Sequence, residues 1–269
     1  MTLVPQSLRP SAPDLKRVAA RLAFIAAAVA LWQIVVVVGI LPADAVAPPT
    51  TVVMALGGLI TTPAFWVSVG GTAVDWGVGT AIALMIAVPI GLLLGASNLL
   101  YRMFRVTIDF LRTVPPVALL PLALLLYGAT SSMAILLVVL GSMWPVLLQS
   151  MYGVHQVDPV MRDVASSYRL SRRDRVVRVI IPSAAPFIAT GIRVAATIGL
   201  LLAVGAEMLG GAPGLGSAIT TAQQATDVPG LYARVVVVAL LGVALNLAML
   251  TLERRVLSWH SSHRPAATG

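Results

Sequence analysis

Few side chains in this sequence could carry out covalent or metal chemistry. The 269 residues include no cysteine, and the three histidines, His155, His260 and His263, are too scattered to suggest a metal site. The single lysine, Lys16, lies in a segment without glycines, so the sequence contains no Walker A loop to hold a nucleotide phosphate. We therefore expect no catalytic residue, no metal and no bound cofactor in this chain, and we expect that it does not bind ATP itself.

Two charged residues lie inside an apolar run that is long enough to cross a bilayer. Arg193 and Glu207 both fall within residues 187–209, and fourteen positions separate them. In a helix they would project from similar sides about 21 Å apart, with Thr197 on the stripe between them. Charge within hydrocarbon is costly and usually marks a functional pathway, so Glu207, Thr197 and Arg193 are candidates for lining one.

Structural roles for these charges stay open. Arg193 could extend to the cytoplasmic headgroups or pair with Asp109. Glu207 could sit at the outer boundary, held by Arg234 or by a backbone amide. Asp75 and Asp109 lie at the ends of apolar runs, which favours an interfacial position for both.

The composition indicates that lipid surrounds most of the chain. Hydrophobic residues make up 58% of it and charged residues only 10%, against about 25% in an average soluble domain. The mean hydropathy is +0.94. A spanning helix needs about 20 apolar residues, so this length accommodates roughly six spans and leaves no room for a separate soluble domain. The net charge of +8 could suggest nucleic acid, but basic residues in a membrane chain mostly report orientation.

Long apolar runs predict an all-α, polytopic protein with six transmembrane helices. Residues 45–71 are predicted as an external loop with a short interfacial helix at 52–60. The expected domains are a cytoplasmic tail 1–21, a membrane domain 22–255 with a cytoplasmic loop 155–182, and a cytoplasmic tail 256–269. The predicted spans are 22–43, 76–100, two helices within 113–157 joined by a turn at 127–132, 187–209 and 231–252.

The basic residues test this topology. With six spans and the N-terminus inside, 17 of the 18 lysines and arginines fall on the cytoplasmic side, and Arg234 alone falls outside. One missed or added span would scramble this partition. We therefore predict that both termini are cytoplasmic.

Prolines interrupt the start of the third predicted span. Pro115 and Pro116 follow the basic end of the preceding segment. Broken helices expose backbone polar groups where they can line a cavity, so these two prolines are a second choice for residues of the pathway.

The cytoplasmic loop 155–182 carries a helical pattern. Its apolar residues recur at helical spacing with charged and polar residues between them, which predicts a short amphipathic helix. These apolar residues are Val157, Met161, Val164, Ala165 and Tyr168. Ser171-Arg-Arg-Asp174 then has the form of a capping box and predicts a second short helix that ends before Pro182. Two short helices with a turn between them would make a protruding knob.

The six arginines of this loop allow a simpler interpretation. They could mark an inner loop and contact anionic lipid headgroups. An amphipathic helix needs something to receive its apolar face, however, and headgroups do not account for the sharp turn. A groove on a cytoplasmic partner accounts for both.

The loop also resembles a known signature. Asp163-Val-Ala-Ser-Ser-Tyr-Arg-Leu-Ser171, followed by Val179-Ile-Ile-Pro182, is similar to the "EAA, three residues, Gly, nine residues, Ile, one residue, Leu-Pro" signature of ABC importer permeases. Arg169 holds the position of the glycine, which usually allows a tight turn. The resemblance implies that this loop couples the chain to an ATPase through Asp163, Val164, Ala165, Tyr168, Arg169, Leu170 and Pro182.

Further segments resemble the nitrate, sulfonate and taurine branch of these permeases. Arg112-Thr-Val-Pro-Pro-Val-Ala-Leu-Leu-Pro121 is similar to its "LR-x-(I/V)-P-x-x-A-L-x-P" stretch. Ala206-Glu207 with Gly214-Leu-Gly216 is similar to its "AE...GLG" segment, and Leu252-Glu-Arg254 to its closing "LER". Asp75 departs from the branch, which often has a basic residue there.

The resemblance implies the type I importer fold and an assembly. Two permease copies, expected to be identical, would form the channel in the cell membrane, above two ATPase subunits that bind ATP and Mg²⁺. A solute-binding protein would deliver a small solute from outside. The branch favours a sulfonate or nitrate-like anion, although it also carries pyrimidine precursors.

Two other classes of function compete with this interpretation. A channel or an ion-coupled secondary transporter would be favoured by paired charges in mid-membrane or by inverted repeats, and neither is apparent. A polytopic membrane enzyme would need clustered His, Asp or Glu near one membrane face, but the acids here are dispersed.

Overall fold

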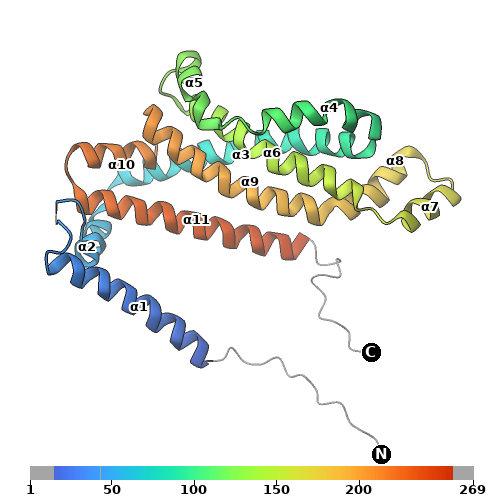
Figure 1. The fold of residues 1–269 in the computed structure, drawn as a ribbon. Helices are drawn as coiled ribbons and strands as arrows, with labels where there is room; N and C mark the ends of the chain where they lie inside the picture. Colours follow the sequence, from blue (N-terminus) through green and yellow to red (C-terminus); the bar gives the residue numbers. More distant parts are fainter. Residues whose placement is uncertain (1–14, 43, 257–269) are drawn as a thin grey trace, which may run out of the picture.

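Three long helices form the centre of the molecule. The computed structural model describes residues 15–42 and 44–256, so parts of both predicted tails, 1–14 and 257–269, lie outside the described residues. Helices α3 (Pro63–Ala96), α6 (Ser131–His155) and α9 (Ile181–Gly210) lie side by side, with α6 packed against both of the others (Figure 1). Helix α11 (Val228–Val256) lies along α9. The all-α prediction is confirmed.

Glycines let α3 approach α6 closely. A Cβ atom added at Gly91 would lie 2.6 Å from the carbonyl oxygen of Leu147, and one added at Gly95 would lie 2.8 Å from that of Met151. Such close backbone approach is how helices associate where lipid offers no hydrophobic driving force. A side chain at either position would push the two helices apart.

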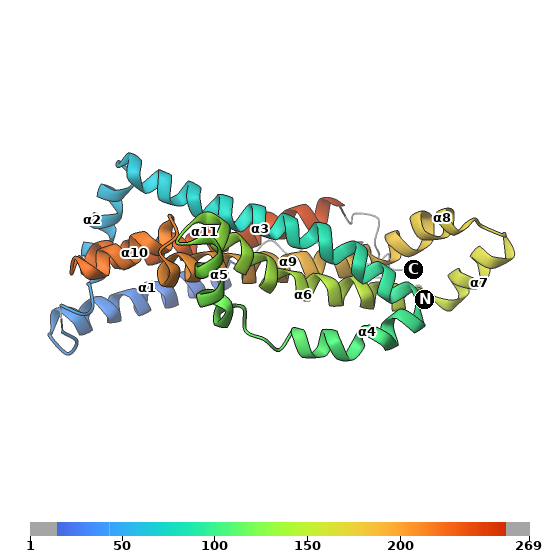
Figure 2. The same ribbon diagram turned by 90° about the horizontal axis from the view of Figure 1, so that it is seen from above.

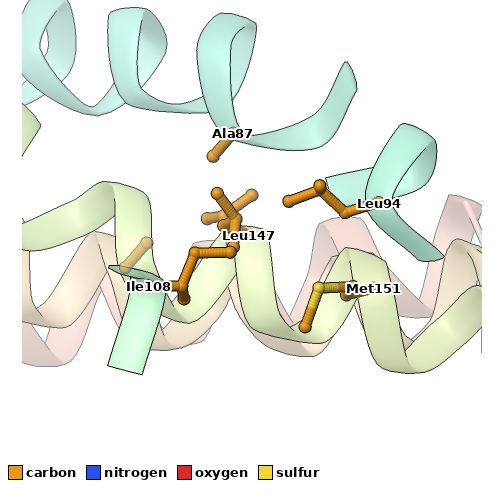
Figure 3. Packing of buried hydrophobic residues seen from close by; sticks show 7 residues of the cluster. Ala87, Leu94, Ile108, Leu147 and Met151 are labelled. Carbon is orange, nitrogen blue, oxygen red and sulfur yellow. The ribbon is translucent and has the colours of Figure 1, made fainter. Parts of the chain in front are cut away.

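An apolar cluster fixes the same ends of α3 and α6. Ala87 and Leu94 on α3 meet Leu147 and Met151 on α6, and Ile108 is added from α4 (Asn98–Leu111) (Figure 3). Ile108 is the only residue of α4 that is buried. Helix α4 therefore lies on the surface of the α3–α6 pair, with its arginines outward.

The region predicted as the third span does not form one straight membrane-spanning helix. The 3₁₀ turn η1 (Pro116–Leu119) and α5 (Leu120–Tyr127) contain 4 and 8 residues, which gives about 20 Å, shorter than a bilayer core. They follow α4 with a bend of 75°. Pro115 and Pro116 cause the break, because proline lacks a backbone donor and disfavours helix in the residue before it. Five described helices are long and apolar enough to span a membrane, or six if this bent pair counts as one span.

Most other elements fall near their predicted places. The turn at 127–132 is confirmed, with Gly128 ending α5 at a φ of 65°. A short helix α2 (Pro49–Leu59) matches the one predicted in the external loop, but α3 begins earlier than expected, at Pro63. Helix α1 (Leu15–Val37) contacts α2 and diverges from the bundle (Figure 1).

Short helices cap the two ends of the bundle. Helix α10 (Leu215–Gln224), which was not predicted, lies with α2 at one end. Helices α7 (Pro159–Ser167) and α8 (Arg172–Arg175) project at the opposite end (Figure 2). Each end carries one candidate functional feature.

Candidate functional site

The projecting loop is built from two capped helices. The Asp158 carboxylate accepts the amide of Val160 at 2.8 Å and caps α7. The Ser171 hydroxyl accepts the amide of Asp174 at 3.1 Å and donates to the Asp174 carboxylate at 2.6 Å. The predicted helix start at Ser171 is confirmed, with capping of the kind that favours serine and aspartate.

The turn between α7 and α8 is left-handed at Arg169. The amide of Leu170 donates to the Ala165 carbonyl at 3.0 Å, and the amide of Arg169 donates to the Ser166 carbonyl at 2.9 Å. Arg169 has a φ of 52°. This pair of bonds is a Schellman motif, in which glycine usually holds the left-handed position. The tight turn therefore forms without the glycine of the signature, at a strain of about 1 kcal/mol.

Ala165 lies inside the loop. Its side chain is 2% exposed and packs with Val157, Val179 and Leu170. The prediction that Ala165 belongs to a face received by a partner groove is wrong, because the Schellman turn folds Leu170 back onto α7 and closes over it. Ala165 thus packs α7 against Leu170 of the turn and against Val179, which follows α8.

The outward apolar surface of α7 consists of other residues. Tyr168 is 79% exposed, Val160 65%, Met161 49% and Val164 45%. We call these four residues the α7 patch. Asp163 and Arg169 are also exposed, and Leu170 is half-buried. Clustered apolar side chains exposed to water are typical of interaction surfaces.

The helix after Ser171 does not end before Pro182. A π-helical turn, η2 (Val176–Ile180), joins α8 to α9, so one continuous helix runs from Arg172 to Gly210. Pro182 is the second residue of α9. The wide π turn leaves room for the ring of Pro182, which also lacks a backbone donor, and α9 continues through a further proline, Pro186. The projecting loop is thereby joined directly to the central helix α9.

At the opposite end, Glu207 fixes α10 to the bundle. Its Oε2 atom accepts from the Thr72 hydroxyl and from the Gly216 amide, both at 2.8 Å. The Thr72 hydroxyl in turn accepts the Leu215 amide at 2.8 Å. We call these four residues the Glu207 latch. A carboxylate is well placed at this helix start, where free backbone amides and the helix dipole favour negative charge.

The prediction that Glu207 faces a pathway does not fit this geometry. The side chain is fully buried among α3, α9 and α10 of the same chain. The alternative in which a backbone amide holds Glu207 is confirmed, while Arg234 lies 3.7 Å from Asp227 instead. Asp75, expected at the interface, is also fully buried in α3. Glu207 is an interior position because the unpredicted α10 covers this end of α9. Asp75 is not at a helix end because α3 begins at Pro63, earlier than expected.

Arg193 pairs with the end of α11. Its Nη1 atom lies 3.3 Å from the Glu253 carboxylate, and the two side chains are 34% and 15% exposed. The suggested pairing with Asp109 is wrong, since Asp109 contacts Arg112 at 3.2 Å. Glu253 lies in the "LER" segment that the sequence analysis singled out. Its acidic side chain could have suggested an ion pair with Arg193, but that pairing was not predicted.

The remaining pathway candidates are dispersed. Thr197 donates to the Arg193 carbonyl at 3.1 Å, and both residues line a cleft of about 30 Å³ between α9 and α11. Pro115 is exposed and Pro116 packs against Gly141 of α6. The structure thus brings Arg193 and Thr197 together but not with Glu207 at the other end of α9. No cluster of three or more His, Cys, Asp or Glu residues occurs in ranges 15–42 and 44–256.

Comparison with known proteins identifies the family. Residues 87–258 match the family described as binding-protein-dependent transport system inner membrane component. The chain belongs to this family. It is a multi-pass inner membrane protein and a permease subunit of an ABC importer, a class that works with ATPase and solute-binding partners.

Several named permeases are similar to this importer subunit. The aliphatic sulfonates transport permease SsuC of Bacillus subtilis is 30% identical over 87% of this chain and 85% of its own length. The nitrate import permease NrtB of Leptolyngbya laminosa is 31% identical over 63% of this chain and 61% of its own. The taurine transport system permease TauC of Escherichia coli is 33% identical over 66% of this chain and 65% of its own.

Solved structures show the same fold. A permease chain of the MetNI methionine ABC transporter in an inward-facing conformation matches with a TM-score of 0.65 and 17% identity, covering 73% of this chain and 99% of that one. An amino acid ABC transporter with histidines matches with a TM-score of 0.61 and 18% identity, covering 76% and 98%. The expected type I importer permease fold is confirmed.

Proposed function

We propose that this permease carries a small sulfonate or nitrate-like anion and is driven by a separate ATPase that docks on the α7 patch. The observation that carries the coupling is an exposed apolar patch held on a rigid loop that continues into a 39-residue helix. The chain itself binds no cofactor and catalyses no reaction. ATP and Mg²⁺ are bound and ATP is hydrolysed by the partner.

The coupling works as a mechanical link. An ATPase groove receives Val160, Met161, Val164 and Tyr168. The contacts of Ala165 and Leu170 with Val179 keep α7 fixed to η2. Movement of the groove on ATP binding then moves α7, α8 and α9 as one body. Such a link biases the permease between two conformations in which the binding cavity opens to opposite sides.

The orientation follows from charge. The α7 and α8 end lies in the cytoplasm with both termini, and α2, α10 and Arg234 lie outside, since this arrangement keeps 17 of 18 basic residues inside. Two identical copies form the channel, lined in part by Arg193, Thr197, Pro115 and Pro116. A cysteine introduced at Arg173 should be labelled only from the cytoplasmic side, and external labelling would contradict this topology.

The substrate class is supported by the relatives. The names of three of them specify aliphatic sulfonates, nitrate and taurine, and that of a fourth, CmpB of Synechococcus elongatus, specifies bicarbonate. These solutes are small and each carries an oxyanion group. A small oxyanion is therefore the shared chemistry that we assign to the solute.

The test is uptake by a reconstituted importer. The permease, its ATPase and its binding protein are placed in vesicles, and labelled ethanesulfonate, taurine, nitrate and bicarbonate are offered with and without ATP. We expect uptake of at least one of them only with ATP. Uptake driven by an ion gradient without ATP would instead support a secondary transporter, and uptake by passive flow would support a channel.

A further inference from the structure

A polar cleft opens at the α10 end, away from the α7 patch. It measures about 310 Å³ and lies between the α2–α3 corner, α10 and α11. This volume is within the range of small-molecule sites. Its chemistry is set by one arginine, one aromatic ring and four hydroxyl groups, namely those of Arg234, Phe65, Thr62, Ser68, Ser217 and Thr221.

Arg234 offers unused donors in this cleft. Its side chain is 19% exposed, and its Nη1 atom makes both of its contacts within the described residues, to the Gly230 carbonyl at 2.9 Å and to Asp227 at 3.7 Å. Its Nε and Nη2 donors thus remain available to a ligand. A guanidinium with two adjacent free donors is suited to a carboxylate, sulfonate or phosphate group.

The hydroxyl groups offer the opposite property. Each already donates its hydrogen to a backbone carbonyl of its own segment and can therefore act toward a ligand only as an acceptor; the Ser217 oxygen also accepts the Gly214 amide at 3.1 Å, which leaves it one lone pair. The bonds run from Thr62 to Leu59 (2.8 Å), from Ser68 to Ala64 (3.1 Å), from Ser217 to Gly214 (2.9 Å) and from Thr221 to Ser217 (2.9 Å). Acceptors gathered in this way suit a group that can only donate, such as a protonated amine.

We propose that this cleft, the Arg234 cleft, binds a small zwitterion, with its oxyanion on Arg234 and its ammonium group on the hydroxyl oxygens. Two sources offer this chemistry, namely a dissolved aminosulfonate or amino acid and the headgroup of phosphatidylethanolamine. The site is additional to the proposed transport function. Only the side from which a dissolved ligand arrives depends on the proposed orientation.

The position of the cleft joins it to the Glu207 latch. Leu215, whose amide is held by Thr72, lines the cleft, and Ser217 and Thr221 follow it on α10. A bound zwitterion would connect α3 through Ser68, α10 through Thr221 and α11 through Arg234. Binding should therefore hold α10 against the bundle and raise the thermal stability of the chain.

The experiment compares three probes on the full-length permease in phosphatidylcholine nanodiscs. Choline has no N–H donor, so this lipid can compete only through its phosphate and cannot make the ammonium contacts with the hydroxyl oxygens. Taurine carries both charged groups, ethanesulfonate only the anion and ethylammonium only the cation. We expect taurine to bind at least tenfold more tightly than either, measured by calorimetry and by the rise in melting temperature. Equal binding of taurine and ethanesulfonate would overturn the proposal.

Variants locate the binding. Arg234→Gln should weaken taurine binding at least tenfold, and Thr221→Val should lower the preference for taurine over ethanesulfonate. Arg254→Gln, at the far end of α11, is the matched control and should bind like the parent. Should Arg234→Gln fail to fold, Thr221→Val still decides, because an unchanged preference in that variant contradicts the assignment of the ammonium group.

Lipid composition separates the two sources. Adding phosphatidylethanolamine to the nanodiscs should raise the apparent Kd of taurine if the headgroup also enters the cleft, while an unchanged Kd assigns the cleft to dissolved zwitterions. All of these measurements are made without ATP or transport. Their failure would leave the proposed transport function intact, and failure of ATP-driven uptake would leave them intact.

Discussion

The Thr72 hydroxyl on α3 donates to Glu207 on α9 at 2.8 Å while it accepts the amide of Leu215 at the start of α10. The Thr72 side chain thus connects α3 to α9 and α10, which lie more than a hundred residues later in the sequence. Glu207 and Leu215 are fully buried, so water cannot replace a hydrogen bond that is lost in this group. The Glu207 latch is therefore a structural device at the end of the bundle opposite the α7 patch.

Removing the carboxylate should loosen α10. Glu207→Ala leaves the Gly216 amide without its acceptor and leaves the Thr72 hydroxyl with only the longer bond to the Ser68 carbonyl at 3.3 Å, at a cost of about 1 to 3 kcal/mol. We expect a lower melting temperature and faster proteolysis within 211–227. Glu207→Gln, which keeps one acceptor oxygen, should lose less.

The same pair of variants tests the earlier pathway interpretation. A glutamate that faced the solute would reduce transport on substitution while stability stayed unchanged. Unaltered melting of Glu207→Ala together with lost uptake would therefore contradict the latch.

At Arg169 we expect a substitution to stabilise the protein, whereas Glu207→Ala should destabilise it. Because Arg169 has a φ of 52°, Arg169→Gly should relieve strain and stabilise the loop by up to about 1 kcal/mol. Hydrogen exchange of the Leu170 amide should slow. Arg173→Gly, in the helical conformation of α8, is the control and should speed exchange. Faster exchange in Arg169→Gly would show that the arginine side chain supports the turn.

The Arg193–Glu253 ion pair should couple α9 to α11. The partly exposed pair, at 3.3 Å, is expected to contribute on the order of 1 kcal/mol. A double-mutant cycle with Arg193→Gln and Glu253→Gln, read by thermal unfolding, measures the coupling. We expect the two losses to be less than additive. Additive losses would mean that the two side chains act independently.

The sequence predicted what depends on local pattern. Apolar runs placed the long helices, and Ser171 with Asp174 marked a real helix start. Helix α10 had a usable signal as well, because Leu215, Ile219 and Ala222 are buried at helical spacing. Its many hydroxyl and amide side chains concealed that pattern.

The rest depended on contacts that no local pattern records. Pro182 is a helix breaker by rule, yet the π turn before it lets the helix continue. Ala165 and Val164 are neighbours on one predicted apolar helix, and only the return of Leu170 decides which of them is covered. The burial of Glu207 likewise required knowing that α10 folds over it.

The difference between Val164 and Ala165 supplies the sharpest test of coupling. Val164 is 45% exposed on the α7 patch, whereas Ala165 is 2% exposed inside the loop. Val164→Arg should therefore leave the loop folded but place a long charged side chain in the ATPase groove, where desolvation without a partner costs several kcal/mol. Ala165→Arg should instead unfold the loop itself.

We expect Val164→Arg permease to insert in the membrane and to melt at the parent temperature, yet no longer to co-purify with its ATPase or stimulate ATP hydrolysis. Arg173→Ala changes a side chain that is exposed on α8 and outside the patch, so it should retain both properties. Association that survives Val164→Arg unchanged would mean that the α7 patch is not the docking surface. The arginines of the loop would then serve to mark the cytoplasmic side and to contact anionic headgroups.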